Sequence, residues 1–313
     1  MSHKVLIIGF GSSGQRYFEI IKKNYPHYNL KVFSRFHKKN SFFLKKLSDL
    51  ALFNPDTIFF CNPCTKRLKF LNLIKKTKNI FFEKPLSSNY YDGQKIFTLT
   101  KNKKNILVGY NLRFLNILNF VKKNLTKYVG KVYSFNCECG YYLPNWRKKN
   151  YLNSVSAQKK LGGGALLEMS HEFDYIHWIF GNKYKSKIFY LNTKNLKIDV
   201  EDNVKIIFNF KNKVLGSLSL DFLCYKKKRF LTINGSKGTL KVNLINNNLK
   251  LFTKKSKNWE KIAFKRNSIN NTYKELVKYF FYKKSHYLKK NISTIQDSII
   301  ILRNIKDMHK QNK

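Results

Sequence analysis

The sequence has no stretch of 18 or more uncharged apolar residues, which is the length that a membrane-spanning helix requires. The residues after Met1 lack the basic, apolar and cleavage regions of a secretory signal and enter a strand pattern at once. Five cysteines, an odd number, provide no disulfide framework and suit a reducing compartment. We therefore expect a soluble, cytoplasmic protein with no membrane partner.

The sequence also lacks a histidine at zinc spacing beside Cys137 and Cys139, which alternate on one face of a predicted strand. We interpret these two cysteines as packing residues and expect no metal site. Cys61 and Cys64 form a C-x-x-C pair at a strand end, where a thioredoxin-like site could lie. A turn of small residues is the favoured interpretation, because the strand and helix pattern described below already accounts for it.

Acidic residues are scarce: the 313 residues include 17 Asp and Glu against 62 Lys and Arg, for a net charge of +45. Such a charge attracts nucleic acid and anionic membranes. The lysines are spread from Lys4 to Lys313, however, and accompany many Asn, Ile, Phe and Tyr residues, all encoded by AT-rich codons. Base composition explains the charge, so we expect no specific nucleic-acid partner. The alternative, nucleic-acid binding, predicts a basic patch on one face and a steep salt dependence.

No internal repeat, Pro-rich linker or low-complexity segment separates domains, so a change of pattern near residue 115 indicates a close-packed hinge. Before it, short apolar runs alternate with amphipathic stretches, which predicts a doubly wound parallel sheet, an α/β Rossmann domain over residues 1–115. The predicted strands are Val5–Ile8, Leu30–Phe33, Thr57–Cys61, Ile80–Phe82 and Ile106–Val108, and the predicted helices are Gln15–Lys23, Phe42–Leu47 and Arg67–Lys76.

After this point, alternation with period two predicts an α+β domain with an open, mainly antiparallel sheet over residues 116–313. One long helix interrupts the strands, and two more close the chain. The predicted strands are Lys131–Cys139, Val204–Phe210, Leu215–Phe222, Phe230–Asn234 and Thr239–Val242, and the predicted helices are Ala165–Phe180, ending at Gly181, Thr272–Tyr282 and Thr294–His309.

A glycine-rich turn follows the first predicted strand and opens a helix. It reads Gly9-Phe10-Gly11-Ser12-Ser13-Gly14, a complete G-x-G-x-x-G. In this context glycines permit a tight turn and close approach of a pyrophosphate, and the helix N-terminus attracts the anion. The motif therefore predicts a dinucleotide site rather than a merely glycine-rich turn.

The end of the second strand bears on the choice of dinucleotide. An acidic residue there would bind the ribose 2′-hydroxyl of NAD, but the sequence has Ser34-Arg35. A hydroxyl and a guanidinium suit a 2′-phosphate, so NADP is favoured over NAD. In so basic a chain the arginine could also be incidental, and both cofactors stay open.

The fourth strand ends in Glu83-Lys84-Pro85. At this point the chain resembles the Gfo/Idh/MocA oxidoreductases (glucose-fructose oxidoreductase, inositol dehydrogenase), which carry E-K-P at this strand end. Carboxyl ends of such strands face the cofactor crevice, so Lys84 would lie beside the nicotinamide and stabilise an alkoxide. A solvated surface lysine is the alternative, which its position disfavours. The resemblance also implies a cis bond before Pro85.

The second part of the resemblance is a glycine triplet, Gly162–Gly164, followed by an acid and then H-x-x-D. On a helical projection Glu168, His171 and Asp174 lie opposite an apolar stripe, a side that could line a cleft or simply be solvated. The resemblance implies that His171 is the general acid/base and that Asp174 orients it or binds substrate.

Three positions depart from the family pattern. The acid Glu168 stands three residues before His171 instead of four, and Ser170 replaces a usual glycine, so the role of Glu168 is open. The turn after the third predicted strand has Arg67 where the family has histidine. Asn62 and Pro63 of this turn, with Glu83, are still expected to border the cofactor.

Two further segments resemble the family and suggest which residues contact the substrate. Gly109–Phe114 resembles the family's exit from the fifth strand, and Tyr141–Arg147 resembles a substrate loop of a branch associated with surface-sugar synthesis. Arg113 and Arg147 could hold a carboxylate or phosphate, or could form structural ion pairs. We assign Arg113, Trp146, Arg147 and Glu168 to the substrate.

We therefore expect an NAD(P)-dependent dehydrogenase or reductase that acts on a sugar-type substrate in net or redox-neutral chemistry. The resemblance assigns substrate binding and homo-oligomer formation to residues 116–313. The alternative is a non-catalytic nucleotide-binding or sensing protein; retention of Lys84, His171 and Asp174 speaks against it.

Overall fold

The computed structural model describes residues 2–35, 40–103, 105–146, 150–282 and 291–311. The chain forms two compact units. The first consists of Met1–Asn111 and Ile269–Arg303, and the second of Leu112–Ser268 and Asn304–Lys313. Each unit is thus discontinuous, whereas the sequence suggested two continuous domains; the difference is largest for Ile269–Arg303, which belongs with the N-terminal segment.

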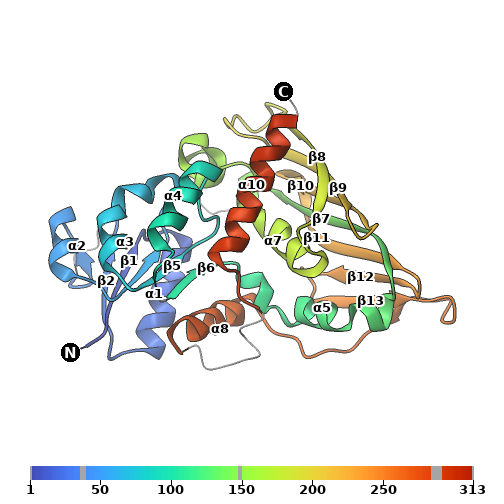
Figure 1. Cartoon of the computed structure of the whole chain (residues 1–313), viewed down its shortest axis with the longest axis horizontal. Helices are drawn as coiled ribbons and strands as arrows, with labels where there is room; N and C mark the ends of the chain where they lie inside the picture. The colour runs from blue at the N-terminus through green and yellow to red at the C-terminus, as the bar shows by residue number, and fades with distance from the viewer. Residues whose placement is uncertain (1, 36–39, 104, 147–149, 283–290, 312–313) are drawn as a thin grey trace. The chain divides into compact units, whose positions relative to one another are not determined.

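The first unit contains a six-stranded sheet in the order β3-β2-β1-β4-β5-β6 (Figure 1). All of its neighbouring strands pair in parallel. This is the doubly wound order, which confirms the predicted Rossmann class. Every residue of β4 and most of β1 and β5 are buried, as expected for a sheet covered on both faces. The strands are β1 (Lys4–Ile8), β2 (Asn29–Phe33), β3 (Phe43–Leu44), β4 (Thr57–Phe60), β5 (Asn79–Phe82) and β6 (Asn105–Val108).

Helices cover the two faces of this sheet. Helix α1 contacts α8, and α3 contacts α4 on the opposite side (Figure 1). Stacked aromatic rings form much of the core: the Phe59 and Phe81 centroids lie 4.8 Å apart, and Phe280 of α8 lies 5.3 Å from Phe59. The helices are α1 (Ser12–Asn24), α2 (Leu47–Phe53), α3 (Leu71–Lys76), α4 (Tyr90–Thr100) and α8 (Ile269–Tyr282).

The helix predicted over Phe42–Leu47 is wrong. Phe43 and Leu44 form β3, which extends the sheet by pairing with Val32 and Phe33 of β2. Pairing as a strand buries the Phe43 ring against Phe10, with centroids 5.0 Å apart. A short aromatic run is ambiguous in sequence, and here the contact with a distant strand decides its state.

The second unit contains an eight-stranded sheet in the order β14-β13-β12-β11-β7-β10-β9-β8. All neighbouring strands are antiparallel except β7 and β10, which pair in parallel. The predicted open, mainly antiparallel sheet is confirmed. The strands are β7 (Val132–Tyr142), β8 (Tyr184–Leu191), β9 (Asn203–Phe210), β10 (Leu215–Asp221), β11 (Leu223–Gly235), β12 (Thr239–Asn243), β13 (Asn248–Phe252) and β14 (Glu260–Lys261).

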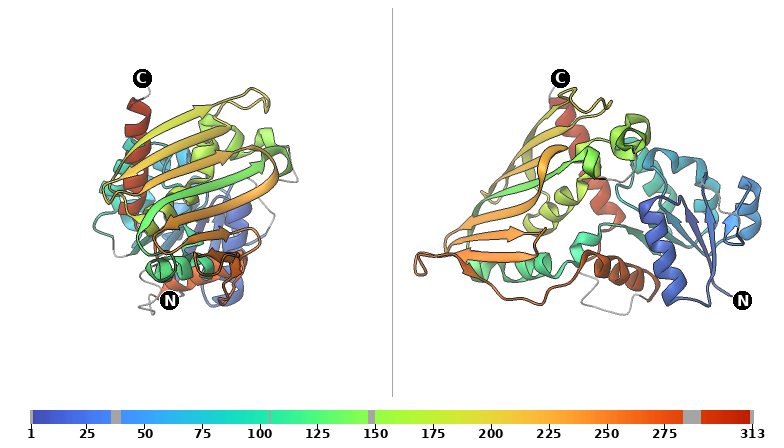
Figure 2. Two further views of the ribbon diagram at one scale, coloured as in Figure 1. Left: turned by 90° about the vertical axis from the view of Figure 1, so that its right-hand side faces the viewer. Right: turned by 180° about the vertical axis from the view of Figure 1, so that it is seen from behind.

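Helices α5 (Asn116–Val129), α6 (Ala165–Glu168) and α7 (Ser170–Phe180) belong to this unit. Burial alternates along β9, so one face of the sheet forms a core and the other is exposed. The left view of Figure 2 looks onto the exposed face. The single helix predicted over Ala165–Phe180 is interrupted at Met169, whose φ of −96° and ψ of 26° end α6 before α7 begins.

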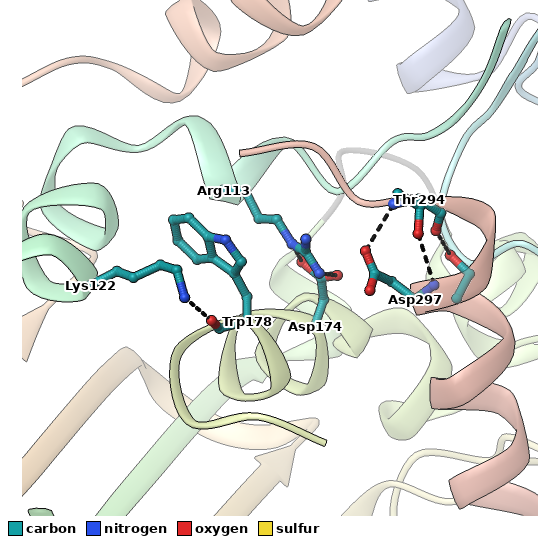
Figure 3. Close-up of polar contacts among 7 residues, drawn as sticks. Arg113, Lys122, Asp174, Trp178, Thr294 and Asp297 are labelled. Carbon is teal, nitrogen blue, oxygen red and sulfur yellow. Dashed lines mark hydrogen bonds and ion pairs between the residues drawn. The ribbon is translucent and has the colours of Figure 1, made fainter. Parts of the chain in front are cut away.

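Helix α10 (Ile295–Gln311) begins with a reciprocal cap. The Thr294 N–H donates to Asp297 Oδ2 at 2.9 Å, and the Asp297 N–H donates to Thr294 Oγ1 at 3.1 Å (Figure 3). The sequence placed this helix at Thr294–His309, close to its observed bounds. None of the helices in the described parts of the chain is both long and apolar enough to cross a bilayer.

Candidate functional site

The three motif glycines have different surroundings in the first unit. Gly9 has φ of +97°, and a Cβ there would lie 2.6 Å from the Asn62 backbone nitrogen. A Cβ on Gly14 would lie 2.1 Å from the Gly9 carbonyl oxygen. A Cβ on Gly11 would meet no described heavy atom within 4 Å. The outer glycines therefore permit β1, β4 and α1 to approach one another, and Gly11 leaves open space.

Gly11 is also the N-cap of α1. No side chain in the described residues caps this helix end, and no acidic residue occupies its first turn. The first N–H groups of a helix carry partial positive charge and need acceptors. Open space beside these donors fits a pyrophosphate, as predicted for Gly9, Gly11, Gly14 and for Phe10, Ser12 and Ser13 between them.

Asn62 and Pro63 follow β4 at the carboxyl edge of the same sheet. Both polar atoms of the Asn62 amide are buried and have no hydrogen-bond partner among the described residues. A buried amide that is not satisfied costs free energy. An external group that both donates and accepts, such as a carboxamide, would fit the Asn62 amide.

Lys84 is the second residue after β5, and the Lys84-Pro85 peptide bond is cis, as the family resemblance implied. Lys84 is partly exposed, whereas Glu83 is buried and accepts a 2.8 Å hydrogen bond from the Tyr17 hydroxyl. Burial raises the pKa of Glu83, and the Lys84 ammonium is the strongest group opposing this. Glu83 is thus held inside the unit, whereas solvent reaches the Lys84 side chain.

At the end of β2, Ser34 is buried and Arg35 is exposed. Strand β2 neighbours β1 in the sheet, so these two residues stay the predicted contacts to the ribose side of a dinucleotide. An exposed guanidinium is suitable for a 2′-phosphate.

In the second unit, the glycine triplet forms a tight approach to Glu201. Gly164 has φ of +105°, and a Cβ there would lie 2.2 Å from Glu201 Oε1. The Leu166 N–H donates to this same carboxylate oxygen at 3.1 Å. Glu201 therefore accepts from the start of α6, the segment that leads to His171.

Arg113 and Asp174 form a buried, two-pronged ion pair (Figure 3). Arg113 Nε donates to Asp174 Oδ2 at 2.8 Å, and Nη2 donates to Oδ1 at 2.7 Å. The side chains are 4% and 2% exposed. Of the two possibilities left open for Arg113, the structure shows an internal ion pair. The Arg113 guanidinium carbon also lies over the Trp178 ring, 5.8 Å from its centroid.

His171 lies on α7 and is 8% exposed. Its neighbour Glu172 is fully buried and accepts a 2.6 Å hydrogen bond from Arg229 Nε on β11. Two ion pairs, at Glu172 and at Asp174, therefore anchor the helix that carries His171. The possibility of an ordinary solvated face on this helix is excluded, since Ser170–Ile176 is buried throughout.

The expected substrate loop is described in part. Trp146 stacks on Tyr141, with centroids 5.0 Å apart and planes 12° apart. Tyr141 also lies 6.0 Å from the Arg229 guanidinium. Glu168 ends α6 and is partly exposed. Arg147 lies outside the described residues.

Sequence reasoning missed the roles of Tyr17, Arg67 and Glu201. Arg67 was noted as a departure, yet nothing in sequence indicated that its side chain is 1% exposed. Tyr17 falls on the apolar stripe of α1, where an aromatic residue is ordinarily core. Glu201 lies 37 residues from Gly164 in the chain, so only the fold brings them together.

The C-x-x-C pair, Cys61 and Cys64, directly follows β4. Neither residue forms a disulfide bond, Cys64 is buried, and burial raises the pKa of the Cys61 thiol well above its usual value. A reactive thiol needs a lowered pKa. The packing interpretation of this turn fits these observations.

Comparison with known proteins gives one family match. Residues 126–241 match the GFO/IDH/MocA C-terminal domain. A curated relative is an uncharacterized oxidoreductase of Streptococcus pneumoniae serotype 4, 23% identical over 177 residues, which are 54% of this chain and 47% of the relative. The chain thus aligns with about half the length of this relative.

Three solved structures share the fold of nearly the whole chain. Biliverdin reductase from Synechocystis, in complex with biliverdin and NADP+, has a TM-score of 0.75 and 15% identity, and the alignment covers 98% of each chain. The WlbA dehydrogenase from Bordetella pertussis, in complex with NADH and UDP-GlcNAcA, has 0.74 and 16%, covering 99% and 96%. A super-repressor mutant of Gal80p from Saccharomyces cerevisiae has 0.79 and 16%, covering 100% and 96%.

The two-domain architecture, the glycine turn and the E-K-P strand end stand together with these matches. They confirm the resemblance to the Gfo/Idh/MocA family, and residues 126–241 match the model of its C-terminal domain.

Proposed function

We propose that this protein is an NAD(P)-dependent dehydrogenase or reductase acting on a hydroxyl or carbonyl of a sugar-type substrate. The observation that carries the proposal is the open space at Gly11 beside the N-terminus of α1, which no side chain in the described parts of the chain caps. No packing requirement explains a glycine there, whereas a pyrophosphate does. Fold relatives that bind NADP+ or NADH support the assignment.

The cofactor would be held by residues of the first unit. Residues Gly9–Gly14 hold the pyrophosphate, Ser34 and Arg35 the ribose end, and Asn62 and Pro63 the nicotinamide end with Glu83 and Lys84. When bound, the nicotinamide ring gives or takes a hydride at its C4. The exposed Arg35 favours NADP over NAD.

The protein's own groups handle charge and proton. Lys84 donates hydrogen bonds to the substrate oxygen and stabilises negative charge there. His171 takes or returns the hydroxyl proton as general acid/base. Asp174, which lies on α7 with His171, pairs with Arg113 and so holds this helix in place. Trp146, Arg147 and Glu168 are the remaining candidates for contact with substrate.

The second candidate is a nucleotide-sensing protein without turnover. The similarity of the fold to that of the super-repressor mutant of Gal80p favours it. A sensor needs the glycine turn but no proton-transfer residue. The Lys84 and His171 pair therefore discriminates the two candidates, since only an enzyme loses a measurable rate when either is replaced.

The first experiment is titration with NADPH and NADH, followed by nicotinamide fluorescence at moderate salt. We expect saturable binding in wild type and none in Gly11→Trp, because the indole fills the space for pyrophosphate. Gly11→Ala is the matched control, since its methyl group meets no described atom within 4 Å. If wild type binds neither NADPH nor NADH, the proposal is refuted.

A second experiment separates enzyme from sensor. His171→Asn should bind the cofactor like wild type but abolish turnover of an accepted sugar or sugar-nucleotide, and Lys84→Met should abolish the same turnover. If a full panel of such substrates gives no turnover with wild type, while binding of the cofactor alters association with another macromolecule, the sensor is supported. A homo-oligomer and a cytoplasmic location also stay predictions.

A further inference from the structure

A single buried arginine connects the two strand ends that are proposed to border the nicotinamide. Arg67 follows β4 in the chain, and its side chain is 1% exposed. Its Nη1 donates to the carbonyl oxygens of Pro85 at 2.5 Å and Leu86 at 2.8 Å. Its Nη2 lies 3.5 Å from the Asn62 carbonyl oxygen as a donor.

These contacts restrain the main chain on the C-terminal side of Lys84. On the N-terminal side, the Glu83 N–H donates to the Phe60 carbonyl at 2.9 Å, and the Glu83 carboxylate accepts from Tyr17. Lys84 is thus the one residue between two fixed points. The side chain of Lys84 starts from a backbone that has little freedom to tilt.

Burial of a guanidinium is costly and needs a specific compensation. Two charge-assisted hydrogen bonds, the Phe82 ring at 5.8 Å and attraction to Glu83 provide it. Arg67 Nε has no partner among the described residues, so the cost of burying this side chain is not fully compensated. An apolar side chain of similar volume would pack at lower cost. The arginine is the residue type that reaches several carbonyls from one plane.

We propose that Arg67 is a positioning residue that aims Lys84 and Asn62 at the nicotinamide end of the cofactor. The proposal rests on the proposed function, because it presupposes a dinucleotide in the first unit. It assigns a role to a position at which this chain departs from the histidine of its family.

The test compares Arg67→Lys with wild type, with Arg303→Lys, an exposed position in the same unit, as matched control. A lysine keeps the charge but cannot span the carbonyls of Leu86 and Asn62. Arg67→Met removes every donor, and Arg67→Lys keeps the test valid if Arg67→Met does not fold. Each variant is titrated with NADPH and with ADP-ribose, which lacks the nicotinamide, and is followed by hydrogen exchange.

We expect amides of Leu86–Asn89 in Arg67→Lys to exchange about tenfold faster or more, with β1 and α1 unchanged. The dissociation constant of NADPH should rise about tenfold, and that of ADP-ribose less than about twofold. Equal weakening of both ligands would mean that Arg67 only supports the fold and overturns the proposal. Unchanged exchange at Leu86–Asn89 in both variants overturns it as well.

Failure of the proposed function has a different signature. In that case wild type binds neither NADPH nor NADH, whereas the exchange at Leu86–Asn89 still responds to Arg67→Lys if Arg67 fixes this segment. If wild type does bind NADPH but Arg67→Lys exchanges its Leu86–Asn89 amides at the wild-type rate, the positioning role alone is refuted.

Discussion

Tyr17 and Glu83 meet inside the first unit, where the tyrosine hydroxyl donates to Glu83 Oε2 at 2.8 Å. Tyr17 belongs to α1, the helix whose N-terminus is proposed to face the pyrophosphate, and Glu83 precedes Lys84. Both side chains are buried. The hydrogen bond therefore joins the two parts of the proposed cofactor site through the core.

Loss of this hydrogen bond should be costly. Tyr17→Phe leaves the buried Glu83 carboxylate without its donor, so we expect the free energy of unfolding to fall by about 1–3 kcal/mol. Urea unfolding measures the change, and Tyr133→Phe, at a site that is 53% exposed, is the control. Equal stability of Tyr17→Phe and wild type would show that Glu83 is protonated or otherwise satisfied.

The pH dependence of stability offers a second measurement. Burial raises the pKa of Glu83 in the folded state above its unfolded value. Between these two values the folded protein binds more protons, so the Glu83 contribution is fully present below the unfolded pKa and is lost as pH rises through the folded one. Glu83→Gln lacks this loss. The stability difference between variant and wild type should shift in favour of the variant as pH rises from 4 to 8, as chemical denaturation at each pH would reveal.

The Arg113 and Asp174 pair predicts that removal of one partner costs more stability than replacement of both. Asp174→Asn leaves a buried guanidinium without its counter-charge, and we expect a loss of about 3–5 kcal/mol of stability. Replacement of both residues, Arg113→Met with Asp174→Leu, should recover much of it. Urea unfolding of the single and double variants gives the coupling energy. Strictly additive effects would contradict a coupled ion pair.

The exposed face of the second sheet gives a prediction about assembly. Phe189, Ile207 and Leu215 are 62%, 44% and 55% exposed, and the pairing register puts them on one face of β8, β9 and β10. Apolar residues on an uncovered sheet face suit contact with a second copy. Ile207→Glu should reduce the mass measured by light scattering, and Leu52→Glu on α2 should not. A monomeric wild type would refute the homo-oligomer.

Local pattern was sufficient for much of the fold. The five strands predicted for the first sheet are each observed to within one residue, because a parallel sheet covered by helices needs continuous apolar runs. Edge elements were not predictable in this way. The two residues of β3 are a strand only because β2 offers them a partner.

Residue types at the site were predictable, but their partners were not. Motif context indicated Gly11 and Lys84, since turns and strand ends are local features. The sequence left two roles for Arg113, substrate binding and an internal ion pair. The structure shows the ion pair, because the fold brings Asp174, 61 positions away in the chain, against Arg113. The burial of Arg67 likewise depends on Pro85 and Leu86, residues of another loop.

Helix α8 has a consequence for how the chain acquires its structure during synthesis. The ring of Tyr273 lies 5.7 Å from Tyr17, and that of Phe280 lies 5.3 Å from Phe59, so a late segment completes the core of the first unit. On the ribosome, strands β1 to β6 emerge long before this cover exists. Until about residue 282 has left the exit tunnel, the aromatic face of these strands lacks helix α8 as its cover. During that time it must be protected by a chaperone or by transient collapse. A protein cut after Asn111 would keep that face bare permanently, and the N-terminal segment is therefore not a portable nucleotide-binding module.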